Sequence, residues 1–415
     1  MGLSTSSPEA SSSTTHSGST TGRLRFWGLL SLFNVGIILT LLAVWLGYQE
    51  YRLNQDHGNH GSCSKLKLGE EDPAWEAKVK EALPAMERAV AHFMDLRAEG
   101  KLDDPNPKGR WKRAQHPVAW GCIKDASLEI LPSIDPALKH GLFAQSGKHR
   151  ALVRFSKGSF EPDFAPKITS VALKVFGVKG KRADLRDRDQ KISDANKDTQ
   201  DFITITNPTL PLAAVPEEFT LLHEYLSKAI YPGAFFWLLL NRPTLIPRIG
   251  ALFLRGWRVN NPLLSTHFTV APNRVGEDGI AAKFALVPCE SGNDSFFGGK
   301  QLKWTYIHEI IQDYLNRHEG CMKLMLQRQT DPCADRVDDF LHAWSGPWEH
   351  VGTLRIPKGA QLDRGDDCDN TAFNPFHAVE ANRPLGWVQR VRKEVYAMGS
   401  ARRIEKNPAA AVERQ

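Results

Sequence analysis

The sequence predicts an α+β protein in which an antiparallel sheet or barrel carries peripheral helices and follows one transmembrane helix. Short apolar or alternating runs recur between Gly, Pro, Asn and Asp residues, which is the pattern of strands joined by turns. Helical patterns do not alternate regularly with these runs, so βαβ units fit poorly. Residues 26–48 contain no charged residue, as a membrane span requires.

The strand pattern is present in six segments, namely 151–155, 170–178, 201–206, 280–287, 321–327 and 350–356. Helical periodicity is present at 72–102, 219–231, 307–315 and 387–398. Pro243 and Pro247 interrupt the apolar region 235–257, so it cannot form one spanning helix. It fits either a cover over the core or a pocket, or a patch that lies in a membrane interface.

The N-terminal region divides into a tail and an anchor. Residues 1–25 are rich in Ser, Thr and Gly and predict a disordered tail. As a helix, residues 26–48 would span roughly 34 Å, with Trp27 and Trp45 as interfacial anchors. A cleavable signal peptide normally has a shorter apolar region and a small-x-small site. No charged residue interrupts any face of this helix, which disfavours a buried core helix, so we predict a single-pass anchor.

The positive charges around the anchor predict its orientation. Arg23 and Arg25 precede the span, whereas Arg52 alone follows it closely. This places the N-terminus in the cytoplasm and the remaining chain on the non-cytoplasmic side. The remaining chain divides into a linker, a folded domain and a tail, at 49–71, 72–404 and 405–415.

The overall composition excludes some classes of function. Lys and Arg number 53 against 47 Asp and Glu, a net charge of +6. No basic stripe with interleaved aromatic residues is present, so we expect no nucleic-acid partner. The six cysteines are scattered and lack CxxC spacing, which disfavours a zinc ribbon or an iron–sulfur site. Their pairing depends on the compartment.

Two residues near the C-terminus form a candidate metal-ligand pair. Arg392 and Tyr396 lie four apart on the predicted helix 387–398, so their side chains share one face. A guanidinium group favours the phenolate form of a neighbouring phenol, and a phenolate can ligate a ferric ion. Taken alone, the pair more often indicates a surface arginine stacked on a tyrosine, because RxxxY spacing is common.

A second group of candidate residues lies earlier in the chain. Arg113 precedes His116 by three positions, and the run ALVRFS then brings Arg154 and Ser156. Guanidinium groups match carboxylates in shape and charge. A histidine with its ordinary pKa near 6.5 can take up and return a proton, although structural histidines are far commoner.

The ordered set of motifs resembles the haem-binding core of catalases and catalase-like proteins, most closely the shorter, divergent ones. The set covers about residues 110–403 and comprises RxxH, VRFS, VALKVF, DFITITNP, FNPFH and RxxxY. The resemblance implies a catalase-like antiparallel β-barrel with peripheral helices that binds haem b. In that family a tyrosine ligates the iron.

The resemblance also implies a role for each matching residue. Tyr396 corresponds to the iron ligand, and Arg392 keeps its oxygen anionic. His116 corresponds to the distal acid and base, with Ser156 holding its ring. The residues that correspond to partners of the haem propionates are Arg113, Arg154 and Arg403.

The chain departs from the family on the distal side. Catalases carry an asparagine just before the strand that DFITITNP matches, whereas this chain has Thr199 followed by Gln200. A hydroxyl cannot place an amide over a bound peroxide, and a one-residue offset points Gln200 to the other face of the strand. Rapid dismutation of hydrogen peroxide is therefore less expected, and peroxidase or hydroperoxide-rearranging chemistry stays open.

Three functions follow as hypotheses. The first is a catalase- or peroxidase-type haem b enzyme that acts on hydrogen peroxide or an organic hydroperoxide, including lipid hydroperoxides. The second is an isomerase of fatty-acid hydroperoxides that resembles allene oxide synthase. The third is a binding or scaffold protein that keeps the barrel without haem. The expected partners are the peroxide, the membrane through the anchor, and further copies if the protein is an oligomer.

Overall fold

A computed structural model describes residues 35, 37–53, 63, 65–101, 111–158, 162–183, 190–227, 231–276, 279–290 and 303–407. The chain divides into two compact units, Met1–Tyr51 and Arg52–Gln415. Of the predicted anchor 26–48, residues 26–34 and 36 lie outside the described residues, and 37–53 are helical. None of the helices within the described residues is both long enough and apolar enough to cross a membrane.

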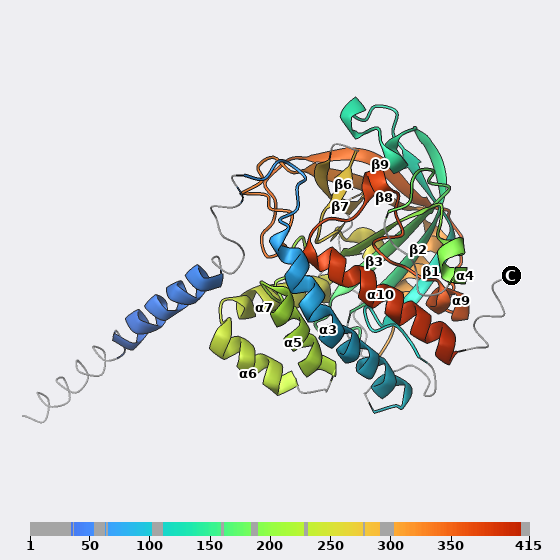
Figure 1. Ribbon diagram of the computed structural model, residues 1–415. Coiled ribbons are helices and arrows are strands. Elements are labelled where there is room, and N and C mark those ends of the chain that lie inside the picture. Colours follow the sequence, from blue (N-terminus) through green and yellow to red (C-terminus); the bar gives the residue numbers. More distant parts are fainter. Residues whose placement is uncertain are drawn as a thin grey trace, which may run out of the picture. The chain divides into compact units, whose positions relative to one another are not determined.

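The larger unit contains an antiparallel β-barrel (Figure 1). The described strands follow the order β5-β4-β3-β2-β1-β9-β8-β7-β6, and β5 also pairs with β7. That second pairing closes a ring of eight described strands, with β6 paired outside the ring to β7. The strands are β1 (Val118–Ile130), β2 (Gly147–Lys157), β3 (Thr169–Phe176), β4 (Thr199–Ile205), β5 (His267–Phe268), β6 (Asn273–Val275), β7 (Ile280–Pro288), β8 (Gly320–Arg328) and β9 (Trp348–Ile356).

Helices lie on the outside of the barrel. They are α3 (Ala74–Ala98), α4 (Gln190–Ala195), α5 (Pro216–Ser227), α6 (Tyr231–Asn241), α7 (Leu245–Arg258), α8 (Ile307–Arg317), α9 (Asp366–Asn370) and α10 (Trp387–Lys406). Short 3-10 turns are η1 (Pro136–Leu138), η2 (Gly141–Phe143), η3 (Pro262–Leu264) and η4 (Glu380–Asn382). The predicted antiparallel barrel with peripheral helices is confirmed. The predicted break in region 235–257 is also confirmed, because α6 ends just before Pro243.

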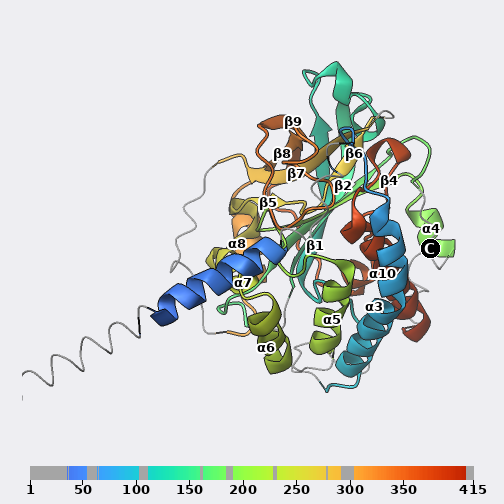
Figure 2. The ribbon, with the colours of Figure 1, turned by 60° about the vertical axis from the view of Figure 1, so that its left-hand side comes forward.

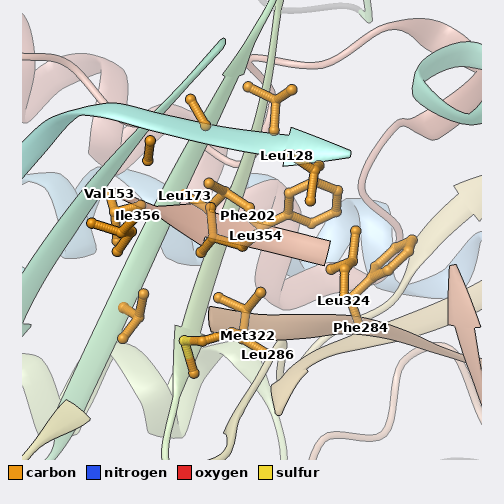
Figure 3. Packing of buried hydrophobic residues seen from close by; sticks show 14 of the residues in the cluster. Leu128, Val153, Leu173, Phe202, Phe284, Leu286, Met322, Leu324, Leu354 and Ile356 are labelled. Carbon is orange, nitrogen blue, oxygen red and sulfur yellow. The ribbon is translucent and has the colours of Figure 1, made fainter. Parts of the chain in front are cut away.

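Apolar side chains fill the interior of the barrel. Alternate residues of each strand point inward, and Val153, Leu173 and Phe202 meet side chains of β7, β8 and β9 there (Figure 3). Phe202 packs edge-on against Phe284, with ring centroids 5.0 Å apart. The intervening residues face outward, so the outer face of β1–β4 is available for a site.

Helix α10 lies beside α3 across the outside of the barrel (Figure 1 and Figure 2). Trp75 of α3 and Trp387 of α10 are both buried, with ring centroids 6.0 Å apart. Arg402 of α10 donates to both carboxylate oxygens of Asp95 at 2.6–2.7 Å. These contacts fix the position of the helix that carries Arg392 and Tyr396.

A buried ionic network joins the outer face of the barrel to the segment before α10. Lys174 of β3 donates to both carboxylate oxygens of Asp201 on β4, at 2.7 and 2.8 Å. The same carboxylate lies 3.1 Å from His377 Nδ1 and accepts the Asn374 backbone N–H. The Asn374 side chain donates to the Lys393 carbonyl of α10 at 3.0 Å. The network therefore sets the distance between β3–β4 and α10.

A second buried carboxylate holds the start of α10. Asp338 accepts the backbone N–H groups of Trp387 and Asp72 at 2.8 and 3.3 Å. Burial raises the pKa of Asp338 to about 6, and the negative charge of Glu71 acts in the same direction. The charged form of Asp338 is therefore less favoured in the folded protein than in the unfolded chain.

Removing Lys174 should destabilise the fold strongly, because it leaves Asp201 charged and buried without its ammonium partner. We expect Lys174→Met to cost about 3–5 kcal/mol of unfolding free energy in urea titrations, and Lys174→Met with Asp201→Asn to cost less than the single change. Lys179→Met is the matched control, because it removes an exposed pair with Asp198. Its cost should stay below about 1 kcal/mol. Equal costs for the two single variants would contradict a structural role for the network.

The pKa of Asp338 predicts a loss of stability as the pH rises. Its folded pKa of about 6 exceeds the ordinary value of 3.8, so the stabilisation is complete below about pH 4 and is lost through pH 6. Asp338→Asn does not titrate. The unfolding free energy of the wild type minus that of the variant should fall by about 2 kcal/mol between pH 4 and pH 7. A difference that stays constant with pH would contradict this explanation.

Candidate functional site

The candidate site lies where the outer face of β1–β4 meets the segment around Phe373 and helix α10. Outward-facing Leu152, Ala172 and Ile203 form one buried apolar cluster with Phe373. Tyr396 of α10 packs against this cluster and is partly buried. Strands from the early barrel and the last helix therefore contribute to the same place.

His116 sits just before β1 in an unusual backbone conformation. Its φ is 49°, and it is the one non-glycine residue with positive φ among the described residues. Such a conformation is strained, particularly before a proline such as Pro117. The ring lies against Gly158, where an added Cβ would come within 3.5 Å of Nδ1. Strain of this kind often accompanies a functional position.

The surroundings of His116 keep its imidazole neutral. Burial, together with the positive charges of Arg154, Arg392 and Arg113, lowers its pKa to about 3. Its buried Nδ1 has no hydrogen-bond partner within the described residues. At neutral pH the ring can therefore accept a proton.

Buried arginines form a dense positive cluster around His116. Arg113 donates through Nη2 to the carbonyl oxygens of Asp369 and Thr371. Arg154 of β2 donates to the His116 carbonyl at 3.0 Å. Burial lowers the pKa of Arg113 well below its ordinary value, and the charges of Arg403 and Arg154 add to this effect. Such a cluster favours the binding of anions.

Asp369 supplies a negative charge to this cluster, and the sequence motifs did not reveal it. Burial raises the pKa of Asp369, but Lys112, Arg154 and Arg113 together hold it below its ordinary value. Asp369 pairs with Lys112. It lies on α9, which the Cys122–Cys368 disulfide attaches to β1. A short polar segment such as 366–370 has no periodicity that could have identified it.

The Arg392–Tyr396 pair forms as the spacing predicted. Arg392 donates through Nη2 to the Tyr396 hydroxyl at 3.5 Å, and its guanidinium carbon lies 5.3 Å from the centre of the ring. Its other terminal nitrogen donates to Gln389 at 3.0 Å. The charge of Arg392 also acts on His116. The tyrosine hydroxyl thus has a cationic neighbour inside the site.

The remaining predicted residues lie at different places on the outer face. Ser156 of β2 is fully buried next to its cross-strand neighbour Ser170, and neither hydroxyl has a hydrogen-bond partner within the described residues. Thr199 begins β4, and its hydroxyl donates to the Asn196 carbonyl at 2.9 Å. No described contact joins Thr199 to His116. Gln200 is buried on the opposite face, as the strand alternation predicted.

The residues present fit an anionic ligand. Arg113 Nε, Arg154 Nε, His116 Nδ1 and the hydroxyls of Ser156 and Ser170 are buried without a hydrogen-bond partner in the described part of the chain. Buried polar atoms are normally paired, so a cluster of unpaired donors indicates a missing acceptor. No group of three or more His, Cys, Asp or Glu residues that could hold a metal ion occurs among the described residues.

Comparison with known proteins supports the fold. No protein-family model matches the sequence, and no curated protein matches it. Among solved structures, the chain is similar to the crystal structure of a fungal catalase, with a TM-score of 0.54 and 16% sequence identity. The similarity covers 71% of this chain and 60% of the catalase, so this chain spans less than two thirds of that protein. The larger unit of this chain has a catalase-like fold.

Proposed function

We propose that the protein is a haem b enzyme of the catalase or peroxidase type that reacts with hydrogen peroxide or an organic hydroperoxide. The observation that carries the proposal is the set of buried, unpaired polar atoms at Arg113, Arg154 and His116. The charge of Arg392, the partner of Tyr396, acts on the same histidine. The catalase-like fold supports it, because the similar solved structure is that of a fungal catalase.

The arginine cluster would hold the cofactor. Arg113, Arg154 and Arg403 supply guanidinium groups for two carboxylates, and the unpaired Nε atoms of the first two are suited to charge-assisted hydrogen bonds. Tyr396 would ligate the iron, and the Arg392 charge stabilises negative charge on its oxygen. When bound, haem supplies a redox-active iron.

His116 would move the proton. Its ring is neutral at physiological pH, so a nitrogen lone pair is available for a proton from one peroxide oxygen. The lowered pKa weakens the ring as a base and strengthens the protonated ring as the acid that returns the proton to the other oxygen. Ser156 is proposed to orient that ring. Within the described residues, neither the Ser156 hydroxyl nor the His116 Nδ1 has a hydrogen-bond partner. Thr199 is proposed to contact the substrate, but its hydroxyl proton is already used by the Asn196 carbonyl.

Because the Thr199 hydroxyl donates to Asn196, it does not replace the distal amide of catalases, and a second chemistry becomes a candidate. With no amide at this position, rearrangement of a fatty-acid hydroperoxide is a second candidate function. The apolar surface on α6 and α7 is compatible with such a substrate. Comparing oxygen release from hydrogen peroxide with loss of a lipid hydroperoxide separates the two chemistries. A haem-free binding protein is the third candidate, and an absorption spectrum decides it.

We also propose that residues 26–48 anchor the chain and that the larger unit lies on the non-cytoplasmic side. The charge-free span and the arginines before it support this proposal. The three disulfides, Cys63–Cys333, Cys122–Cys368 and Cys289–Cys321, support an oxidising compartment for the larger unit. A reporter fused after Gln415 that is active only in the cytoplasm would contradict this orientation.

The role of Tyr396 predicts a change in haem binding. We expect the full chain, purified in detergent with haem, to show a Soret band, and Tyr396→Phe to lose most of the bound haem or shift that band. Tyr314→Phe on α8 is the matched control and should leave the spectrum unchanged. An unaltered spectrum for Tyr396→Phe would refute the ligand assignment. A wild type without a Soret band would favour the haem-free alternative.

The role of His116 predicts a loss of activity without a loss of haem. His116→Ala should keep the wild-type spectrum while its rate of peroxide consumption falls about 10²–10⁴-fold. His318→Ala, at the exposed end of α8, is the control. Because the pKa of His116 is lowered to about 3, protonation of this residue should produce no step in the wild-type rate near pH 6.5. Equal turnover by His116→Ala and wild type would remove the acid–base assignment.

A further inference from the structure

Helices α6 and α7 carry an exposed apolar surface that the proposed haem site does not use. It consists of Phe235, Phe236, Leu239 and Leu240 on α6 and Leu254 on α7, with exposed fractions of 40–69%. Elsewhere in the described part of 52–415, the exposed large hydrophobic side chains are Leu68 and Trp304. Exposed apolar residues of this unit are therefore concentrated on α6 and α7, and we call these five side chains the apolar surface.

Helix α6 is apolar on both of its sides. Ala234 and Leu238 face inward and belong to the core cluster beneath α5, α6 and α7. The opposite side carries four members of the apolar surface where a water-exposed helix would carry polar residues. A helix that is apolar all round normally has apolar surroundings on every side, so the outer face of α6 suits a non-aqueous medium.

The charged residues within α6, α7 and the connection between them are of one sign. Residues 231–258 include four arginines and no acidic residue. Arg242 is paired with Glu218, with a nitrogen–oxygen distance of 2.6 Å. Arg255 and Arg258 lie in the last turn of α7 and are exposed. An apolar helix face bordered by exposed cations is typical of segments that lie in the interface of anionic membranes.

Helix α7 is held firmly against the barrel, so the surface has a fixed position on this unit. A Cβ at Gly256 would lie only 1.8 Å from the Lys167 carbonyl oxygen, which shows how closely the backbones approach. Trp257 donates its indole N–H to the Phe164 carbonyl at 2.6 Å. The two partner residues, Phe164 and Lys167, follow Gly158 in the segment between β2 and β3. Gly158 is the residue that lies against the His116 ring.

We propose that α6 and α7 insert the apolar surface into the boundary between headgroups and acyl chains of an anionic bilayer. The charge pattern disfavours a second copy of the chain as the occupant. A two-fold interface brings the same patch of both copies together, so it would set arginines against arginines. The proposal rests on surface composition and charge, and it does not depend on haem binding.

The six cysteines pair in three disulfides, so one introduced cysteine can be labelled selectively. Leu240→Cys carries an environment-sensitive fluorophore on the apolar surface. Lys148→Cys is the matched control. Lys148 is exposed near the start of β2, whereas Gly158 follows the other end of that strand. The full chain is reconstituted into vesicles of phosphatidylcholine with or without phosphatidylglycerol. The measurement is fluorophore emission and its quenching by lipids that carry a spin label near the headgroup.

We expect blue-shifted emission and strong quenching at position 240 and neither at position 148. Arg255→Gln should lower the ratio of docked to undocked protein about fivefold in phosphatidylglycerol vesicles, because one cation near such a surface contributes about that factor. In pure phosphatidylcholine vesicles the same substitution should have little effect. Equal quenching at the two positions would refute the proposal. A blue shift at 240 that depends on protein concentration and not on the lipid quencher would assign the surface to a second copy.

Discussion

The buried ion pair between Lys174 and Asp201 is the interaction on which the geometry of the site depends. It lies on the outer face of β3 and β4, and its carboxylate also contacts His377 and the Asn374 backbone. Asn374 then reaches the backbone of α10. Placing two charges in the interior costs free energy, and apolar residues of similar size would often stabilise a fold as well. What the pair adds is a directional connection between the barrel and the helix that carries Tyr396.

The arginine cluster opposes folding in the absence of a ligand. Arg113 and Arg154 are buried, their charges repel, and Asp369 is the acidic group that acts on both. Part of their hydrogen-bonding capacity is unused in the described residues. A protein retains such an arrangement where a bound anion compensates for it, because ligand binding to the folded state adds to stability by mass action. The Cys122–Cys368 disulfide keeps the segment around Asp369 in place before any ligand binds.

Local patterns in the sequence predicted most of the barrel, and the exceptions have physical reasons. The six predicted strands correspond to β2, β3, β4, β7, β8 and β9. Strand β1 escaped prediction because its register shifts near Gly121 and again before Ala126, which disrupts the alternation of apolar residues. Helix α10 continues past Met398 because Gly399 is buried against α3, with 3.8 Å between an added Cβ and the Met94 sulfur. In the sequence that glycine resembled a stop signal.

Motif spacing identified the cationic and aromatic members of the site but not the residues that position them. RxxH and RxxxY are short patterns whose members are near neighbours in the chain, so they can be recognised locally. Asp369, Lys174 and Asp201 act through partners far away in the chain, and such pairings leave no periodic signal. Their positions follow from the closed barrel and from α10 lying across its outer face, which only three-dimensional packing determines.

The strained backbone of His116 places its ring among the charged groups of the site. Its positive φ places the ring against Gly158, where burial and the arginines keep it neutral. An anion bound to Arg113 or Arg154 screens their positive charge and thereby raises the affinity of the ring for a proton. Thermodynamic linkage makes this effect reciprocal, so a proton on His116 strengthens anion binding by the same factor. The arginines that fit an anionic cofactor therefore also determine how readily His116 can take up a proton.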